Sequence, residues 1–208
     1  YNEGYGVSKI CIDYAHENGI KLIIILDCGI KAVEEVAYAK SLGIDFIICD
    51  HHVPDDVLPP AVAILNPKRA DDSYPFKHLC GCGVGFKLMQ AFAKNNGIPF
   101  SRLIPLLDLC AVSIAADIVP VVEENRILAF HGLKILNQNP SGGLKAIIDV
   151  CGLNGREIAM SDIIFKIGPR INASGRMDNG KESVDLLVEK DLSHALTVVK
   201  HIDGYNEQ

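Results

Sequence analysis

The chain has 208 residues, a net charge of −6 at neutral pH and a hydrophobic fraction of 49%, enough to bury a core of ordinary domain size. Its apolar stretches are too short to cross a bilayer and it opens without a signal peptide, so we expect a cytoplasmic protein without membrane association. The negative charge argues against nucleic-acid binding through bulk positive charge, although bound divalent cations would supply such charge locally.

The first third of the chain has the pattern of a parallel α/β fold. Residues 21–27 (KLIIILD) and 44–50 (IDFIICD) are continuous apolar runs, which predict strands buried on both faces. An amphipathic helix is predicted between them at 31–42, and a third strand at 61–65. Strand, helix and strand with short connections pair in parallel through a right-handed crossover. The predicted class is therefore α/β, a parallel sheet with flanking helices.

Beyond Pro67 the pattern becomes mostly helical, with no clear linker. The ranges predicted to be helical are 81–94, 101–116, 125–136, 143–150, 182–188 and 193–205. The fold class is thus an α/β part to about residue 70, followed by a mostly helical part.

Two neighbouring predicted strands end in carboxylates, Asp27 and Asp50, and His51 and His52 follow directly. Ligands bind beyond the carboxyl ends of strands in open parallel sheets, and a mixed oxygen and nitrogen set suits Mn²⁺, Fe²⁺ or Zn²⁺. Taken singly, Asp27 fits a turn or helix cap and the histidine pair fits an exposed loop. Taken together, the four residues fit a metal site as well as they fit those local alternatives.

Asp117 ends an apolar helical stretch. A buried acid is costly unless it is paired or metal-bound, and an Asp at a helix C-terminus opposes the helix dipole. The alternative is an ordinary Asp at a helix end.

The ordered strings LDCG at 26–29, DHH at 50–52 and ADIVP at 116–120 resemble the motifs of DHH phosphoesterases. Further segments resemble RecJ-type exonucleases, namely 3–6 (EGYG), 66–69 (NPKR), 74–77 (YPFK), 83–87 (GVGFK), 124–126 (ENR) and 168–176 (GPRINASGR). A lone DHH tripeptide is weak evidence. The full ordered series covers nearly the whole chain and is highly specific.

The resemblance implies a 5′ to 3′ exonuclease on single-stranded DNA, acting in DNA repair and recombination with two divalent cations, Mn²⁺ or Mg²⁺. Asp27 would bridge the two metals, and His51 and Asp117 would be ligands. His52 would contact the metal site or the scissile phosphate. Asp50 would be a ligand or would orient an imidazole, so His52 and Asp50 are the predicted catalytic residues.

A nucleic-acid or phosphate site is predicted in the Gly- and Pro-containing loop at 168–176. Its candidate residues combine arginine forks with uncharged donors: Arg170, Asn172, Ser174 and Arg176. By spacing alone, pairing of these arginines with surface carboxylates is an equal alternative. The glycines at 81, 83 and 85 fit either a phosphate-binding helix start or a close-packed turn.

The resemblance also predicts a DHH core over residues 1–190 and, over 191–208, the start of a helix that leads to a C-terminal domain. The family's acidic first motif has no counterpart in the chain. We therefore expect the first strand to be missing and the chain alone to bind metal weakly, with little or no nuclease activity. The expected partner is single-stranded DNA, with a helicase or a single-strand-binding protein as a further candidate, and the expected state is a monomer.

Two other functions stay open. One is a DHH phosphodiesterase for short oligonucleotides or cyclic dinucleotides, against which segments 66–69 and 170–176 favour the exonuclease. The other is a non-catalytic DHH-fold binding module. The intact set of Asp27, His51, His52 and Asp117 argues against that module.

Overall fold

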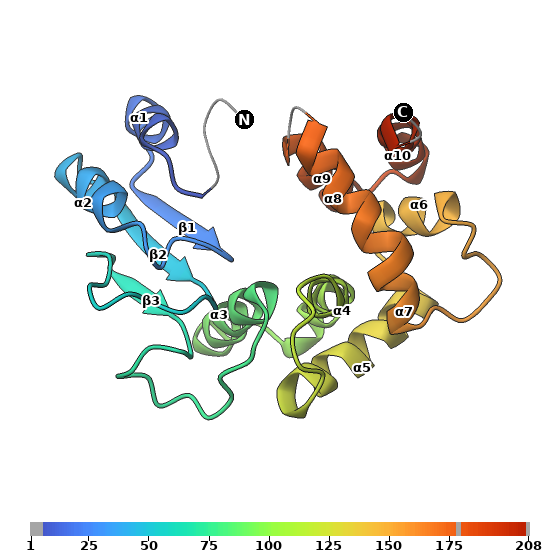
Figure 1. Cartoon of the computed structure of the whole chain (residues 1–208), viewed down its shortest axis with the longest axis horizontal. Helices are drawn as coiled ribbons and strands as arrows, with labels where there is room; N and C mark the ends of the chain where they lie inside the picture. Colours follow the sequence, from blue (N-terminus) through green and yellow to red (C-terminus); the bar gives the residue numbers. More distant parts are fainter. Residues whose placement is uncertain (1–5, 178–179, 207–208) are drawn as a thin grey trace. The chain divides into compact units, whose positions relative to one another are not determined.

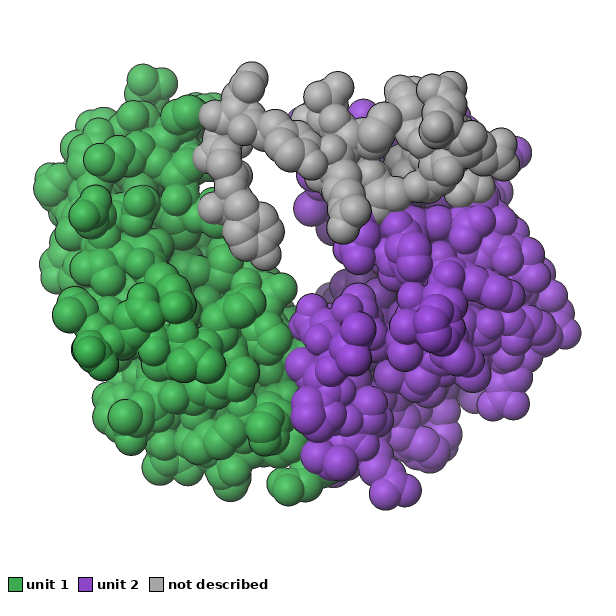
Figure 2. Space-filling view, in the orientation of Figure 1, with its two compact units in different colours: residues 1–98, 123–125 green, residues 99–122, 126–208 purple. Residues whose placement is uncertain are grey.

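The computed structural model describes residues 6–177 and 180–206, and contacts within the chain divide it into two units. Unit 1 comprises residues 1–98 and 123–125, and unit 2 comprises 99–122 and 126–208 (Figure 2). Figure 1 labels the helices and strands. The contact boundary thus falls at residue 98, beyond the change of sequence pattern near residue 70. The division into a 1–190 core and a 191–208 connecting segment stays a prediction.

Unit 1 is built on a parallel sheet with the strand order β1-β2-β3. The strands are β1 Leu22–Leu26, β2 Asp45–Cys49 and β3 Ala63–Leu65. Leu26 pairs with Cys49, and Cys49 pairs with Leu65, so all three strands end in register. The residues that follow them, Asp27, Asp50 and Asn66, therefore emerge together at the carboxyl edge of the sheet.

Helices cover both faces of this sheet. Helices α1 Lys9–Glu17 and α2 Val33–Ser41 bury their apolar side chains with Phe46 and Ile48 of β2 on one face. Helix α3 Gly81–Asn95 contacts β1 and β2, and its Gly85 approaches the Leu26 side chain. Ile23 and Ile25 face the α1–α2 side, and because successive side chains of a strand point to opposite faces, α3 lies on the other face.

The prediction that residues 21–27 are buried on both faces is wrong for one face. Leu22, Ile24 and Leu26 are 46%, 51% and 54% exposed. The helix on this face is α3, and the residue that it brings to Leu26 is Gly85, which has no side chain to cover the strand. The predicted fold class is otherwise confirmed, with a parallel sheet, flanking helices and a helical second part.

Unit 2 is helical, and its helices pack around one apolar core. Its α-helices are α4 Leu107–Ala116, α5 Glu123–Gln138 (whose first residues belong to unit 1), α6 Gly142–Val150, α7 Met160–Asp162, α8 Gly168–Met177, α9 Gly180–Val188 and α10 Leu192–Asn206. None of the described helices is long and apolar enough to span a membrane.

The single helix predicted over 101–116 is wrong in its first part. Two 3-10 turns, Phe100–Arg102 and Ile104–Leu106, precede α4. Pro105 lies in the second turn, where it has no N–H to continue an α-helical hydrogen-bond ladder. The first α-helical residue is therefore Leu107.

The loop predicted at 168–176 is also wrong, because these residues lie in α8. A π-helical segment, Ile163–Ile167, joins α7 to α8, and the Gly168 N–H donates to the carbonyl of Ile163. A proline inside a helix removes one backbone hydrogen bond and crowds the preceding turn. The wider π turn directly before Pro169 accommodates both effects, so the chain stays helical through the proline.

Asp162 at the start of this helical segment provides a pH-dependent anchor. Its carboxylate accepts hydrogen bonds from Arg156 and from the Ala159 N–H at 3.1 Å. The Arg156 hydrogen bonds, and then that of Ala159, hold the pKa of Asp162 below its ordinary value. A lowered folded-state pKa stabilises the fold above the unfolded value of about 3.9 and is lost as the pH falls through the folded value.

We therefore expect unit 2 of the wild type to lose stability in acid more steeply than that of an Asp162→Asn variant, which lacks this titration. Urea unfolding of both proteins between neutral pH and strong acid measures the difference. If the stabilities of the two proteins fall in parallel below about pH 4, Asp162 is not the pH-dependent anchor.

Candidate metal centre

Asp27 is the first residue after β1, and its backbone continues the sheet, since its N–H donates to the Cys49 carbonyl at 2.8 Å. Its φ of 64° lies in the left-handed region, which costs a non-glycine residue about 1–3 kcal/mol but is better tolerated by Asp than by most residues. Two residues on, Gly29 has φ 97°, and a Cβ there would lie 2.0 Å from the Ile25 Cδ1 atom. This turn aims the Asp27 side chain across the sheet edge.

His51 faces Asp27. Its Nδ1 lies 3.1 Å from the Leu79 carbonyl, and because a carbonyl oxygen only accepts, Nδ1 carries the hydrogen. Its Nε2 lies 3.1 Å from Oδ1 of Asp27. That oxygen is buried and accepts no hydrogen bond from the described part of the chain. A neutral Nε2 and a carboxylate oxygen are both acceptors, so a proton or a cation must lie between them.

Asp50 follows β2 and is buried, with only 1% of its surface exposed. Its Oδ2 accepts from the Ile30 N–H at 2.9 Å. Its Oδ1 accepts from the His51 N–H at 2.7 Å, the His52 N–H at 3.1 Å and the His52 Nδ1 at 2.7 Å. Burial raises the pKa of Asp50, but these hydrogen bonds outweigh it, so the pKa is lowered. Asp50 is thus a buried anion whose hydrogen bonds hold both histidines in place.

Asp27, His51 and His52 converge. Each offers one ligand atom, and these atoms lie within 4.8 Å of one another. The His51 and His52 rings meet edge to face, with centroids 4.7 Å apart. Among the described residues this trio is the group whose donors fit a metal ion. The unsatisfied Asp27 Oδ1 and the opposed acceptor atoms support that fit.

The start of α3 borders the same site. A Cβ on Gly81 would lie 2.0 Å from Oδ1 and 2.3 Å from Cγ of Asp27, so only glycine leaves room for this carboxylate. The first N–H groups of a helix form the positive end of its dipole and favour a negative charge there. The glycines at 81, 83 and 85 lie inside α3, so the close-packing alternative describes them better than a phosphate-binding loop.

Cys28 follows Asp27 in the chain and is not a member of this trio. Burial, followed by the charges of Asp50 and Asp27, raises the pKa of Cys28, which keeps its thiol neutral. Burial likewise raises the pKa of Cys49 to about 11. The donor set of the trio consists of oxygen and nitrogen.

The other predicted site residues lie in unit 2. Asp117 caps the C-terminus of α4, where Ser113 Oγ lies 3.3 Å from its Oδ2. The next residue, Ile118, is 79% exposed and has φ 53°, a strained conformation for a β-branched side chain. The role of Asp117 as a metal ligand stays a prediction.

Arg170 is a half-buried residue of α8 and Asn172 an exposed one, and Nη1 of Arg170 lies 3.3 Å from the Lys166 carbonyl. The side chains of Ser174 and Arg176 lie outside the described residues. Phosphate binding by these four residues stays a prediction.

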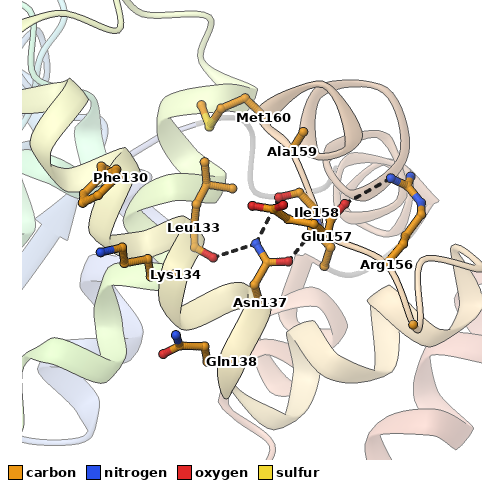
Figure 3. Close-up of a pocket in the computed structure, with 11 residues that line it drawn as sticks. Phe130, Leu133, Lys134, Asn137, Gln138, Arg156, Glu157, Ile158, Ala159 and Met160 are labelled. Atoms are coloured by element: carbon orange, nitrogen blue, oxygen red, sulfur yellow. Dashed lines mark hydrogen bonds between the residues drawn. The ribbon is translucent and has the colours of Figure 1, made fainter.

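A cavity of about 840 Å³ in unit 2 contains none of the predicted site residues. It lies between α5 and the segment 155–160, and Figure 3 shows Phe130 and Lys134 on the α5 side with Arg156 at the other end. Arg156 is already engaged by Asp162. Among the described residues, the group that fits a metal ion therefore lies at the sheet edge of unit 1 and not in this cavity.

Three contributors to that edge were not predicted: the Leu79 carbonyl, Gly81 and Asn66. The first two become visible only when α3 packs on the sheet, since they lie far from Asp27 and His51 in the sequence. Asn66 had a readable signal, because it follows the third strand as Asp27 and Asp50 follow the first two.

Comparison with known proteins agrees with this architecture. Residues 4–114 match the DHH family, N-terminal domain, and the chain belongs to that family. A structure described as exonuclease RecJ bound to manganese superposes with a TM-score of 0.86 at 29% identity, covering 99% of this chain and 51% of the other.

Similar full-length proteins carry the same description. The single-stranded-DNA-specific exonuclease RecJ of Escherichia coli (strain K12) is 38% identical over 217 residues, which cover 100% of this chain. The protein of that name in Bacillus subtilis (strain 168) is 39% identical over 208 residues, again covering 100% of this chain. The chain spans 38% and 26% of the lengths of these two relatives.

Proposed function

We propose that the chain forms the metal-binding core of a single-stranded-DNA-specific exonuclease, which removes nucleotides from the 5′ end in DNA repair and recombination. The observation that carries the proposal is the buried Oδ1 of Asp27, which lies 3.1 Å from Nε2 of His51 and accepts no hydrogen bond within the described part of the chain. The manganese-bound relative and the names of the similar proteins support the same reading.

Asp27, His51 and His52 would hold the metal, and Asp117 would complete a site for two divalent cations, Mn²⁺ or Mg²⁺. Such cations, when bound, activate water and stabilise the charge on the leaving oxygen. Asp50 would act through the histidines, fixing the orientation of both.

Arg170, Asn172, Ser174 and Arg176 would contact the DNA backbone. The substrate would be single-stranded DNA in the cytoplasm, and a helicase or a single-strand-binding protein would be a partner of the monomer.

A chimera tests this function directly. In it, the chain replaces the matching 217 residues of the Escherichia coli relative. With Mn²⁺ present, the chimera should release mononucleotides from 5′-labelled single-stranded DNA and far less from duplex DNA. His51→Ala should lower the rate by more than about a hundredfold, because a direct ligand matters more than the residues that support it.

His131→Ala is the matched control, since His131 is an exposed histidine of unit 2. It should leave the rate unchanged. Retained activity in the His51→Ala chimera would contradict the metal assignment. Hydrolysis of cyclic dinucleotides in place of DNA would favour the other class of DHH phosphodiesterase.

A further inference from the structure

We propose that Asn66 is a positioning residue of the metal centre, which fixes the backbone of His52 and thereby the orientation of its imidazole. This inference rests on the proposed function. Asn66 is the first residue after β3, at the same sheet edge as Asp27 and Asp50, and only 1% of its surface is exposed.

Both ends of the Asn66 amide are engaged. Its Nδ2 donates to the His52 carbonyl at 2.8 Å, and its Oδ1 accepts from the Lys68 N–H at 2.9 Å. A carbonyl can only accept and an N–H can only donate, so these two partners define which end of the amide is oxygen and which is nitrogen. The side chain therefore has one orientation, and it connects the end of β3 to the end of β2.

His52 needs such support because its side chain is 53% exposed and cannot be held by packing alone. Asp50 holds one side of the residue, accepting from both its N–H and its Nδ1. Asn66 holds the other side through the carbonyl. With Nδ1 hydrogen-bonded to a carboxylate, Nε2 is the ring nitrogen left to bind a metal.

The loop that carries Asn66 is itself anchored. The Arg69 N–H donates to the Asn66 carbonyl at 3.2 Å, and Nη1 of Arg69 donates to the Ile64 carbonyl of β3 at 2.7 Å. Asp71 pairs with the same guanidinium. Because the loop is tied back to the sheet, a change in the Asn66 side chain should be transmitted to His52 rather than absorbed by loop movement.

The test compares Asn66→Ser and Asn66→Leu with the wild type in the complete chain. Serine can keep the turn to Lys68 but is too short to reach His52. Leucine has a similar volume and removes both hydrogen bonds. The matched control is Asn137→Ser, because Asn137 also bridges a backbone N–H and a backbone carbonyl, both of Ile158, at 2.7 and 3.0 Å (Figure 3).

Two quantities are measured: Mn²⁺ affinity by paramagnetic resonance of the free ion, and the ¹⁵N resonances of the His52 imidazole in the metal-free protein. We expect both Asn66 variants to bind Mn²⁺ about 10–100-fold more weakly and to shift the His52 resonances. Asn137→Ser should lower stability alone and leave both quantities unchanged.

Wild-type affinity and unshifted His52 resonances in both Asn66 variants would overturn the inference, as would an equal loss of affinity in Asn137→Ser. A wild-type chain without Mn²⁺ binding would instead count against the proposed function. In that case the metal-free His52 resonances would still decide whether Asn66 positions the imidazole.

Discussion

Replacing Asp50 by asparagine should lower the free energy of unfolding of unit 1 by about 1–3 kcal/mol, the cost of leaving a buried hydrogen-bond donor unpaired. The carboxylate accepts from four donors, on Ile30, His51 and His52. An asparagine amide keeps one oxygen and turns its NH₂ group toward donors, which leaves at least one of them unpaired. Urea unfolding measures the loss.

Asp45→Asn is the matched control. Asp45 begins the strand that Asp50 follows, and its side chain is exposed, so the same substitution there should change stability by no more than about 0.5 kcal/mol. Mn²⁺ affinity should fall together with stability in Asp50→Asn, because both histidines lose their orientation. Lost Mn²⁺ binding with unchanged stability would show that Asp50 is a ligand rather than a support.

Replacing Gly81 by alanine should weaken metal binding more than it lowers stability. The new Cβ would lie 2.0 Å from Oδ1 of Asp27, which must move away. The Asp27 Cβ would also lie only 2.6 Å away, so part of the strain reaches the backbone of the turn. The preference of about 1 kcal/mol for alanine over glycine within a helix offsets that strain only in part. We therefore expect a modest loss of thermal stability with at least about a tenfold loss of Mn²⁺ affinity.

Gly83→Ala provides the comparison, because Gly83 lies in the same turn of α3. Its added Cβ would meet Sγ of Cys80 at 3.3 Å and a methyl of Leu79 at 3.4 Å, which small side-chain shifts can relieve. This variant should retain Mn²⁺ affinity. Equal Mn²⁺ affinities in the two alanine variants would show that metal binding does not depend on the space that Gly81 leaves for Asp27.

The sheet and its functional edge could be predicted from the sequence because both depend on local patterns. Continuous apolar runs indicated β1 and β2, and short crossovers made them parallel. Because parallel strands end at the same edge of a sheet, their ends predict that Asp27 lies beside His51. Their ligand atoms do lie together with that of His52.

The unpredicted features depend on contacts between distant residues or on competing local effects. The tautomer of His51 is set by the Leu79 carbonyl, and room for Asp27 is set by Gly81, both contributed by the start of α3. Pro169 suggested a loop, but the π turn before it keeps the chain helical. Helix α1 was not predicted, although Ser8 caps it by accepting from the Cys11 N–H.

The most direct test of the metal centre is pulsed paramagnetic resonance of Mn²⁺ bound to the chain with ¹⁵N-labelled histidine. Two imidazole nitrogens should couple to the ion in the wild type, and His51→Ala should remove one coupling and weaken binding by more than about a hundredfold. Bound Mn²⁺ without any nitrogen coupling, or unchanged binding in His51→Ala, would contradict a metal site built from Asp27, His51 and His52.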